Sequence, residues 1–142
     1  MKISEIMTKD VISLSVDDTV KHAIDLMKEY NIGSIPVNAD GRIVGIVTDR
    51  DIILRCAAEG KDLKIEKVRN IMTSNPVVGD RNINGDDAAR IMSERQIRRL
   101  PIISNNELVG IVSLGDLAVE PNLHEEARGA LSEISIPCTH NI

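Results

Sequence analysis

Two short segments of the chain place a carboxylate three residues after a hydroxyl side chain. They are Thr48–Asp51, with the sequence TDRD, and Ser113–Asp116, with the sequence SLGD. Such a pair can form a capping box, in which both side chains bond free backbone N–H groups at a helix start, although Glu or Gln is the more usual third-position partner. An ionised aspartate offers only acceptors, so it also suits the hydroxyl groups of a bound molecule. Both interpretations stay open at this point.

The two segments belong to an internal repeat. The sequence IMT at 6–8 recurs at 71–73, IPV at 35–37 recurs as LPI at 100–102, and VGIV at 44–47 recurs at 109–112. The offset is 65 residues each time, because positions 7, 36 and 45 correspond to 72, 101 and 110. Residues 1–54 align with 66–119 without a gap, and an ungapped register of this length indicates a duplication.

Each copy predicts the same elements in the same order. Capping residues at 16–19 precede apolar residues at 20, 23, 24 and 27, which is the spacing of an amphipathic helix. Strands over 34–37 and 42–47 enclose an Asp-Gly turn and predict a hairpin, and a helix follows over 49–59. In the second copy the helix opens at 84–87 and the turn lies at 104–106.

The repeat also predicts how the chain divides. We expect one domain over 1–59, a linker over 60–67, a second domain over 68–119 and a tail over 120–142. Within the tail, residues 124–135 predict a short helix before Pro137, and we expect it to cover a dimer or partner surface.

Composition and charge narrow the function classes. Hydrophobic residues make up 42% and charged residues 27%, as in ordinary globular proteins. The chain has no Phe or Trp and one Tyr, which weighs against aromatic platforms for single-stranded nucleic acid. A net charge of −5 disfavours nucleic-acid and anionic-membrane partners, and no apolar run approaches the ~20 residues of a membrane span. With two distant cysteines as expected free thiols, we expect a cytoplasmic protein.

The repeated residues resemble the cystathionine-β-synthase (CBS) domain family. Both copies carry the Ile-Met-Thr opening, the apolar-Pro-apolar strand, the turn, and Gly-apolar-apolar-[Thr/Ser]-x-x-Asp before the last helix, over residues 1–119. The resemblance implies an α+β (α/β) fold of two β-α-β-β-α units, with two three-stranded sheets packed as a pseudo-twofold pair and flanking helices. It also implies a cleft that holds AMP, ADP, ATP or S-adenosylmethionine, a disc-like homodimer, and regulation of an attached or associated protein.

The resemblance assigns roles to individual residues. Asp51 and Asp116 would accept hydrogen bonds from the ribose hydroxyls, and Thr48 and Ser113 would meet the ribose or the α-phosphate at a helix start. An apolar adenine slot would be lined by two matching sets, for which plain core packing is the alternative. They are Thr8, Val11, Ile12, Ile35 and Pro36 in the first copy, and Thr73, Val77, Val78, Leu100, Pro101 and Ile102 in the second.

The two copies differ most where phosphate should lie. Arg98-Arg99 replaces Gly33-Ser34, and arginine matches phosphate oxygens in a bidentate manner. We therefore expect Arg98 and Arg99 to bind phosphate, with Arg50 and Lys9 as weaker candidates; the alternative is a solvated, charge-rich helix end over 94–99. The asymmetry predicts that one site is occupied more tightly than the other.

Sequence motifs for catalysis and for metal binding are missing. The chain has no GxxxxGK[ST], GxGxxG or GxSxG, so we expect no enzyme activity and no catalytic cofactor. His22, His124 and His140 lack the spacing of a metal site, and a solvent-facing histidine is the favoured interpretation. Cys138 and His140 offer two ligands, too few for a closed zinc site, so we expect no metal.

Two alternative functions remain beside the nucleotide sensor. The chain could be a regulatory subunit of a nucleotide-metabolising enzyme such as inosine-monophosphate dehydrogenase, whose regulatory insert is built from the same repeat. It could also be a dimerisation unit without a ligand.

Overall fold

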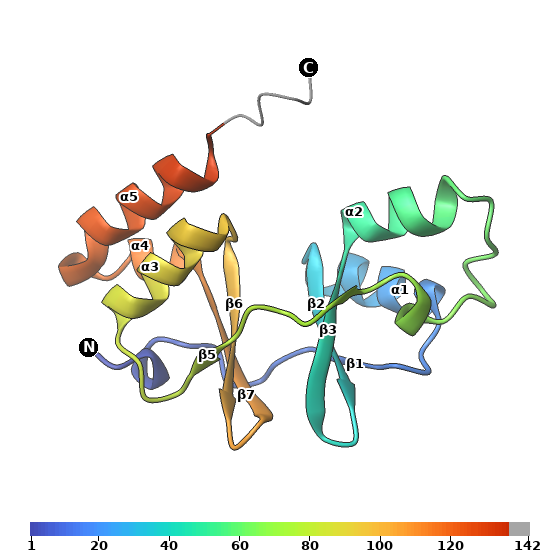
Figure 1. Cartoon of the computed structure of the whole chain (residues 1–142), viewed down its shortest axis with the longest axis horizontal. Coiled ribbons are helices and arrows are strands. Elements are labelled where there is room, and N and C mark those ends of the chain that lie inside the picture. The colour runs from blue at the N-terminus through green and yellow to red at the C-terminus, as the bar shows by residue number, and fades with distance from the viewer. Residues whose placement is uncertain (137–142) are drawn as a thin grey trace. The chain divides into compact units, whose positions relative to one another are not determined.

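The structure is a computed structural model that describes residues 1–136. It divides into two compact units that cross the boundaries of the sequence repeat. The first unit is Ile12–Pro76, and the second unit joins Met1–Val11 to the chain from Val77 onward (Figure 1). Each unit therefore contains most of one repeat and the opening segment of the other. Cys138 and His140, considered above as metal ligands, lie outside the described residues.

The first unit is built on a hairpin with a helix on each side of it in sequence. Helix α1 (Val20–Tyr30) is capped by the Thr19 hydroxyl, which accepts from the backbone N–H of His22, and it ends at Asn31 in the left-handed conformation. Strands β2 (Ser34–Ala39) and β3 (Arg42–Thr48) pair antiparallel around Asp40 and Gly41, whose φ values of 52° and 78° suit a tight turn. β1 (Leu14–Ser15) extends the sheet beside β2, and β4 (Thr73–Ser74) extends it beside β3.

The helix predicted over 49–59 has two forms of winding. It begins as α2 (Asp49–Asp51) and continues as a π-helical segment over Ile52–Ala57. Within it Cys56 is fully buried, and burial raises the pKa of its thiol, so the neutral form is favoured. Cys56 therefore belongs to the core of the first unit, with Leu14, Val37 and Val47 among its other members.

The second unit has the same order of elements and an added C-terminal helix. β5 (Gly79–Asp80) lies parallel to β6 (Arg99–Ser104), which pairs antiparallel with β7 (Glu107–Ser113). Helix α3 (Gly85–Arg95) precedes this hairpin, and α4 (Leu114–Ala118) and α5 (His124–Ile134) follow it. The observed elements confirm the predicted mixed α/β class, and α5 covers the segment where the sequence predicts the tail helix.

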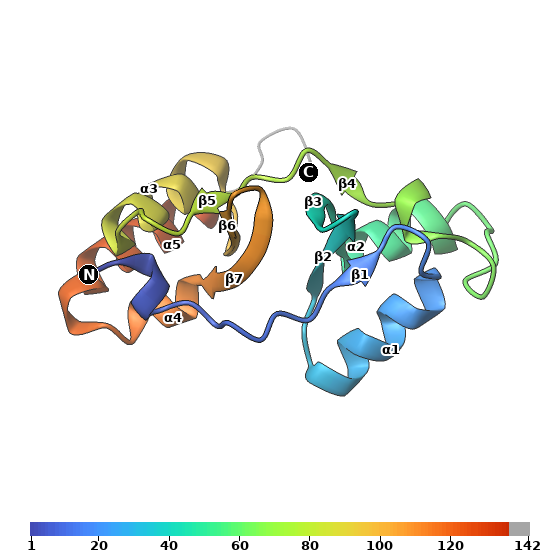
Figure 2. The same cartoon turned by 90° about the horizontal axis from the view of Figure 1, so that it is seen from below.

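Small residues bring α5 against α3. Gly85 stands where the first repeat has Val20, and a Cβ at residue 85 would overlap the side chain of Leu123. Leu123, Ala127 and Ala130 are buried on the facing side, at the spacing of one helical stripe. α5 therefore packs on α3 and α4 as part of the core of the second unit (Figures 1 and 2). That it also covers a partner surface stays a prediction.

The opening segment of each repeat docks on the hairpin of the other. Thr73 pairs with Ile46 in the first unit, and Thr8 bridges to Ile111 in the second. The glycine beside each contact makes room for a methionine: a Cβ on Gly45 would lie 2.5 Å from Met72 Sδ and 2.9 Å from the Thr73 carbonyl oxygen. Gly110 makes the equivalent approach to Met7. The glycine of the repeated VGIV motif thus admits the opening segment.

We expect Gly45→Ala to destabilise the protein by about 1–2 kcal/mol. Overpacking a filled site costs about 1–3 kcal/mol. Part of this cost is offset because alanine lowers the conformational entropy of the unfolded chain. Urea unfolding of the variant measures the change. Gly129→Ala is the control, because a Cβ at this helical position would meet no atom within 4 Å beyond its chain neighbours and the backbone of its own helix. Equal stability of the Gly45→Ala variant and the parent protein would contradict this account of the glycine.

No helix in the described part of the chain is long and apolar enough to cross a bilayer.

Candidate functional site

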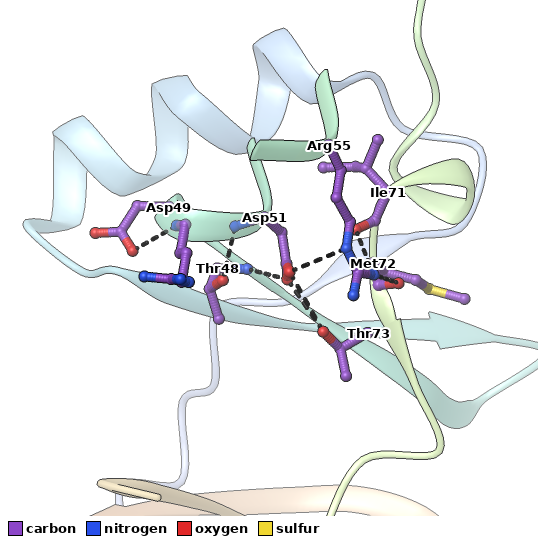
Figure 3. A network of polar contacts seen from close by, with 8 residues as sticks. Thr48, Asp49, Asp51, Arg55, Ile71, Met72 and Thr73 are labelled. Atoms are coloured by element: carbon purple, nitrogen blue, oxygen red, sulfur yellow. Dashed lines mark hydrogen bonds and ion pairs between the residues drawn. The ribbon is translucent and has the colours of Figure 1, made fainter. Parts of the chain in front are cut away.

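The junction between β3 and α2 centres on the carboxylate of Asp51. Its Oδ2 accepts a hydrogen bond from the backbone N–H of Thr48 at 3.0 Å, and the Thr48 hydroxyl accepts one from the N–H of Asp51 at 3.0 Å. The hydroxyl of Thr73 donates to the same carboxylate at 3.3 and 3.4 Å. Asp51 is 8% exposed, so this carboxylate is buried within a network from three segments (Figure 3).

Arg55 extends the network to the opening segment of the second repeat. Its Nε lies 3.8 Å from Asp51 Oδ1, and its guanidinium donates to the carbonyl oxygens of Met72 at 3.1 Å and Ile71 at 3.4 Å (Figure 3). Sequence reasoning missed Arg55. Its signal was present, because Arg55 lies four residues after Asp51 on the same helical face.

The matching junction between β7 and α4 has only the inner part of this network. Asp116 Oδ2 accepts from the N–H of Ser113 at 2.8 Å, and the Ser113 hydroxyl accepts from the N–H of Asp116 at 3.0 Å. Position 120, which corresponds to Arg55, is a glutamate. Within residues 1–136, the Asp116 carboxylate makes no further hydrogen bond or ion pair. Both aspartates therefore form capping boxes, and Asp116 keeps more acceptor capacity for another donor.

A cavity of about 730 Å³ opens beside this second junction. Its charged and polar lining comes from Arg98, Arg99, Ser113, His124 and Arg128. Leu114, Gly115, Ala118, Ala127 and Leu131 supply the apolar part. Within the described part of the chain, no carboxylate lines this cavity, so Asp116 lies outside its lining. The cavity thus combines an apolar wall with three arginines in a chain whose net charge is −5.

Backbone pairing places the two predicted arginines at this cavity. The N–H of Leu114 donates to the Arg98 carbonyl at 2.8 Å, and Arg99 is the register partner of Ser113 between β6 and β7. Both side chains are exposed, and no carboxylate of the described residues lies within 4.0 Å of them. The structure therefore brings Arg98, Arg99 and Ser113 together at one cavity, and a phosphate-binding role for them stays a prediction.

Sequence reasoning did not connect α5 to this site. His124, Arg128 and Leu131 follow one another at spacings of four and three residues, so they form one stripe on the helix. This stripe lines the cavity. The neighbouring stripe of Leu123, Ala127 and Ala130 is buried, and of these three only Ala127 also lines the cavity. The spacing is visible in the sequence, but nothing there shows which element α5 packs against.

The corresponding cavity in the first unit is smaller, and its lining includes a carboxylate. The positions of Arg98, Arg99 and Leu114 are held there by Gly33, Ser34 and Asp49. Asp49 lies beside Gly33, and a cavity of about 300 Å³ is lined by Asp49, Arg50, Ile53 and Leu54. Arg50 and Lys9, the weaker phosphate candidates, are both exposed, and neither lines the larger cavity. The chemical asymmetry seen in the sequence is therefore also an asymmetry of shape.

The predicted adenine residues differ widely in burial. Ile35, Leu100 and Ile102 are fully buried in the cores of their units, and Pro36 and Pro101 are also buried. Four further candidates, Val11, Ile12, Val77 and Val78, are half-buried, whereas Thr8 and Thr73 are exposed. The buried members contribute to core packing, and a shared role in an adenine slot stays a prediction.

The possible metal ligands among the described residues are the acidic, cysteine and histidine side chains. Within residues 1–136, no three of them form a group that could hold a metal ion. His22 and His124 are exposed, and of these two only His124 lines the larger cavity.

Relatives with similar sequences carry the same repeat. The model of the CBS domain family matches residues 3–58 and 68–121. The CBS domain-containing protein YhcV of Bacillus subtilis is 44% identical over 133 residues, which are 94% of each chain. An inosine-5'-monophosphate dehydrogenase of Methanocaldococcus jannaschii is 34% identical over 129 residues. The matched region is 89% of this chain and 25% of that enzyme.

Solved structures with the same fold include proteins with bound ligands. Hypoxic Response Protein I, solved with two coordinated zinc ions, is 31% identical with a TM-score of 0.78, over 84% of this chain and 98% of that one. The CBS domain pair of protein MJ0100, solved with 5'-methylthioadenosine and S-adenosyl-L-methionine, is 26% identical with a TM-score of 0.73, over 83% and 93%. With both repeats matched by the family, and with the duplicated hairpins and capped aspartates described above, the chain belongs to the CBS domain family as a tandem pair.

Proposed function

We propose that this CBS pair is a regulatory module that binds an adenosine-containing nucleotide, namely AMP, ADP, ATP or S-adenosylmethionine, and alters a contact with a partner protein. The observation that carries the proposal is the junction at Ser113–Asp116. There a capped carboxylate with spare acceptor capacity lies in the same short segment as the hydroxyl that lines an arginine-rich cavity. A ribose needs the first feature, and a phosphate group needs the second.

Two further observations support an adenosine ligand. The related CBS pair of MJ0100 was solved with two adenosine compounds. The half-buried Val77 and Val78 of the second unit offer apolar surface of the kind that an adenine ring requires. Under this proposal Asp116 and Ser113 bind the ribose, and Arg98 and Arg99 bind the phosphate. Asp51 and Thr48 have the equivalent role in the first unit.

The proposal includes a cytoplasmic homodimer and a separate effector protein. Ile53 and Leu54 are 59% and 48% exposed on the segment that follows α2, and Val119 is 74% exposed after α4. Large apolar side chains at such exposure support a protein contact at these segments. The similarity to inosine-5'-monophosphate dehydrogenase supports the second candidate function, a regulatory subunit of a nucleotide-metabolising enzyme.

The experiment is a thermal unfolding series with AMP, ADP, ATP, S-adenosylmethionine and the matching guanosine nucleotides. A ligand at a hundred times its Kd adds about 2.7 kcal/mol of stability, so we expect a clear rise in Tm with at least one adenosine compound. We expect Asp116→Asn, which keeps the shape of the side chain and removes its charge, to reduce that rise. Asp86→Asn on the exposed start of α3 is the control.

Other outcomes would decide against the proposal. If no compound raises Tm and calorimetry records no heat, the ligand-free dimerisation unit is the better account. If the rise is unchanged in the Asp116→Asn variant, the ribose assignment is wrong. Turnover of a nucleotide by the purified protein would instead show an enzyme.

A further inference from the structure

The cavity beside α4 has more basic side chains than the repeat alone supplies. Arg98 and Arg99 come from the second repeat, whereas His124 and Arg128 come from α5, which lies outside it. We propose that this cavity binds a diphosphate or triphosphate group, and that α5 completes the site with Arg128 and His124. If the ligand is a nucleotide, the inference rests on the proposed function. If the ligand is an inorganic polyphosphate, the inference is independent of that function.

The charge of the cavity favours an anion. Among residues 1–136, three guanidinium groups and no carboxylate line it, and no ion pair involves Arg98, Arg99 or Arg128. The exposed arginines elsewhere include ion-paired ones, such as Arg69 with Asp17 and Arg90 with Asp87. Arg42, Arg50, Arg81 and Arg95 also form no ion pair within these residues, but none of them lines this cavity. Three arginines without an ion pair therefore lie around one cavity of an acidic protein, where their charges would attract an anion.

The number of arginines favours a polyphosphate over a single phosphate. One guanidinium fork engages two oxygens of a phosphate group, so one phosphate is satisfied by one or two arginines. Here the arginines come from two elements, with Arg98 and Arg99 before and at the start of β6 and Arg128 within α5. A volume of about 730 Å³ is also within the range of ligand sites in proteins. A chain of two or three phosphates would engage both sides of the cavity.

A polyanion held in this way would link α5 to the start of β6. α5 is already fixed on α3 by its buried stripe, and Gln96 donates to the carbonyl of Glu133 at 3.0 Å. Additional bonds from the ligand to Arg128 would lower the frequency of local opening of α5, because a ligand stabilises the state that binds it. The binding signal would thus reach a helix that the repeat itself does not contain.

The experiment is calorimetric titration with sodium tripolyphosphate, ATP, AMP and adenosine. We expect tripolyphosphate and ATP to bind more tightly than AMP and adenosine. We expect Arg128→Gln to weaken the binding of tripolyphosphate about tenfold, the factor that corresponds to 1.4 kcal/mol. Arg81→Gln is the matched control, because it removes the same charge from an exposed position of the same unit that does not line the cavity.

Two measurements keep the result interpretable. Circular dichroism checks the fold of the Arg128→Gln variant, and His124→Gln gives a second variant at the same cavity. Hydrogen exchange of residues 124–134 should slow when tripolyphosphate is added to the parent protein and change less in the Arg128→Gln variant. This readout reports on α5 itself rather than on affinity alone.

The outcomes separate this inference from the proposed function. If ATP binds equally well to the parent and Arg128→Gln proteins, or no more tightly than adenosine, the inference is wrong while an adenosine site stands. If tripolyphosphate binds through Arg128 and adenosine adds nothing to the affinity, the polyphosphate site stands and the adenosine proposal fails. If tripolyphosphate does not bind, or if Arg81→Gln weakens its binding as much as Arg128→Gln does, the cavity is no polyphosphate site.

Discussion

Replacing Leu123 by alanine should destabilise the protein by about 2–5 kcal/mol, the usual range for truncating a buried leucine. Leu123 is 3% exposed and fills the space above Gly85 at the start of α3. Its removal leaves a cavity between the segment that leads into α5 and the core of the second unit. We expect urea unfolding to show the loss, with hydrogen exchange fastest in α5.

Leu131 is the matched control for Leu123. It is 47% exposed on the other stripe of α5, so Leu131→Ala removes the same atoms with a much smaller loss of buried surface. A double variant that combines Leu123→Ala with Gly85→Ala tests the contact directly. The methyl group added at position 85 overlaps the leucine of the parent protein but has room once that side chain is truncated, so the two changes should not be additive. Equal losses for Leu123→Ala and Leu131→Ala would contradict the packing described here.

The duplication made the hairpins and helices predictable. The Asp-Gly turn requires positive φ at two positions, and the structure has these values at Asp40 and Gly41. The stripe at 20, 23, 24 and 27 predicts the helix that is observed as α1, over Val20–Tyr30. These features depend on residues close together in sequence, so local preferences are enough to predict them.

The placement of the opening segments could not be predicted in the same way. The sequence Ile6–Thr8 precedes the first hairpin, yet Thr8 bridges to Ile111 in the second unit. Because both repeats carry the same opening and the same glycine, either segment matches either hairpin locally. Only the path of the chain in three dimensions decides between them. The π-helical winding over Ile52–Ala57 also has no periodic signal that differs from that of an α-helix.

The residues of the candidate site were predictable where they lie within the aligned repeat, and they were not predictable outside it. Arg98 and Arg99 stood out because the first repeat has Gly33 and Ser34 instead. Arg128 lies outside the alignment, so no difference between copies drew attention to it. Arg128 reaches the cavity because α5 packs closely on α3. That packing depends on Gly85 in α3, which leaves room for Leu123 just before α5.

Replacing Asp51 by alanine should cost about 2–4 kcal/mol, whereas Asp116→Ala should cost about 1 kcal/mol, although the two aspartates occupy equivalent positions. Both variants lose a capping box. Asp51→Ala also removes the acceptor of the Thr73 hydroxyl and the partner of Arg55, which join α2 to the opening segment of the other repeat. Urea unfolding followed by hydrogen exchange would assign each loss to its unit.

The unequal roles of the two aspartates also decide how the ribose assignment should be tested. A variant that unfolds the first unit loses its ligand whether or not the carboxylate touches it, so Asp51→Ala cannot separate structure from binding. Asp51→Asn keeps an acceptor for Thr48 and Thr73 and removes the charge, and Thr73→Val removes the additional hydroxyl donor without touching the capping box. If Asp51→Ala and Asp116→Ala prove equally destabilising, the network around Arg55 adds no stability, and the two junctions differ only in the cavity beside each of them.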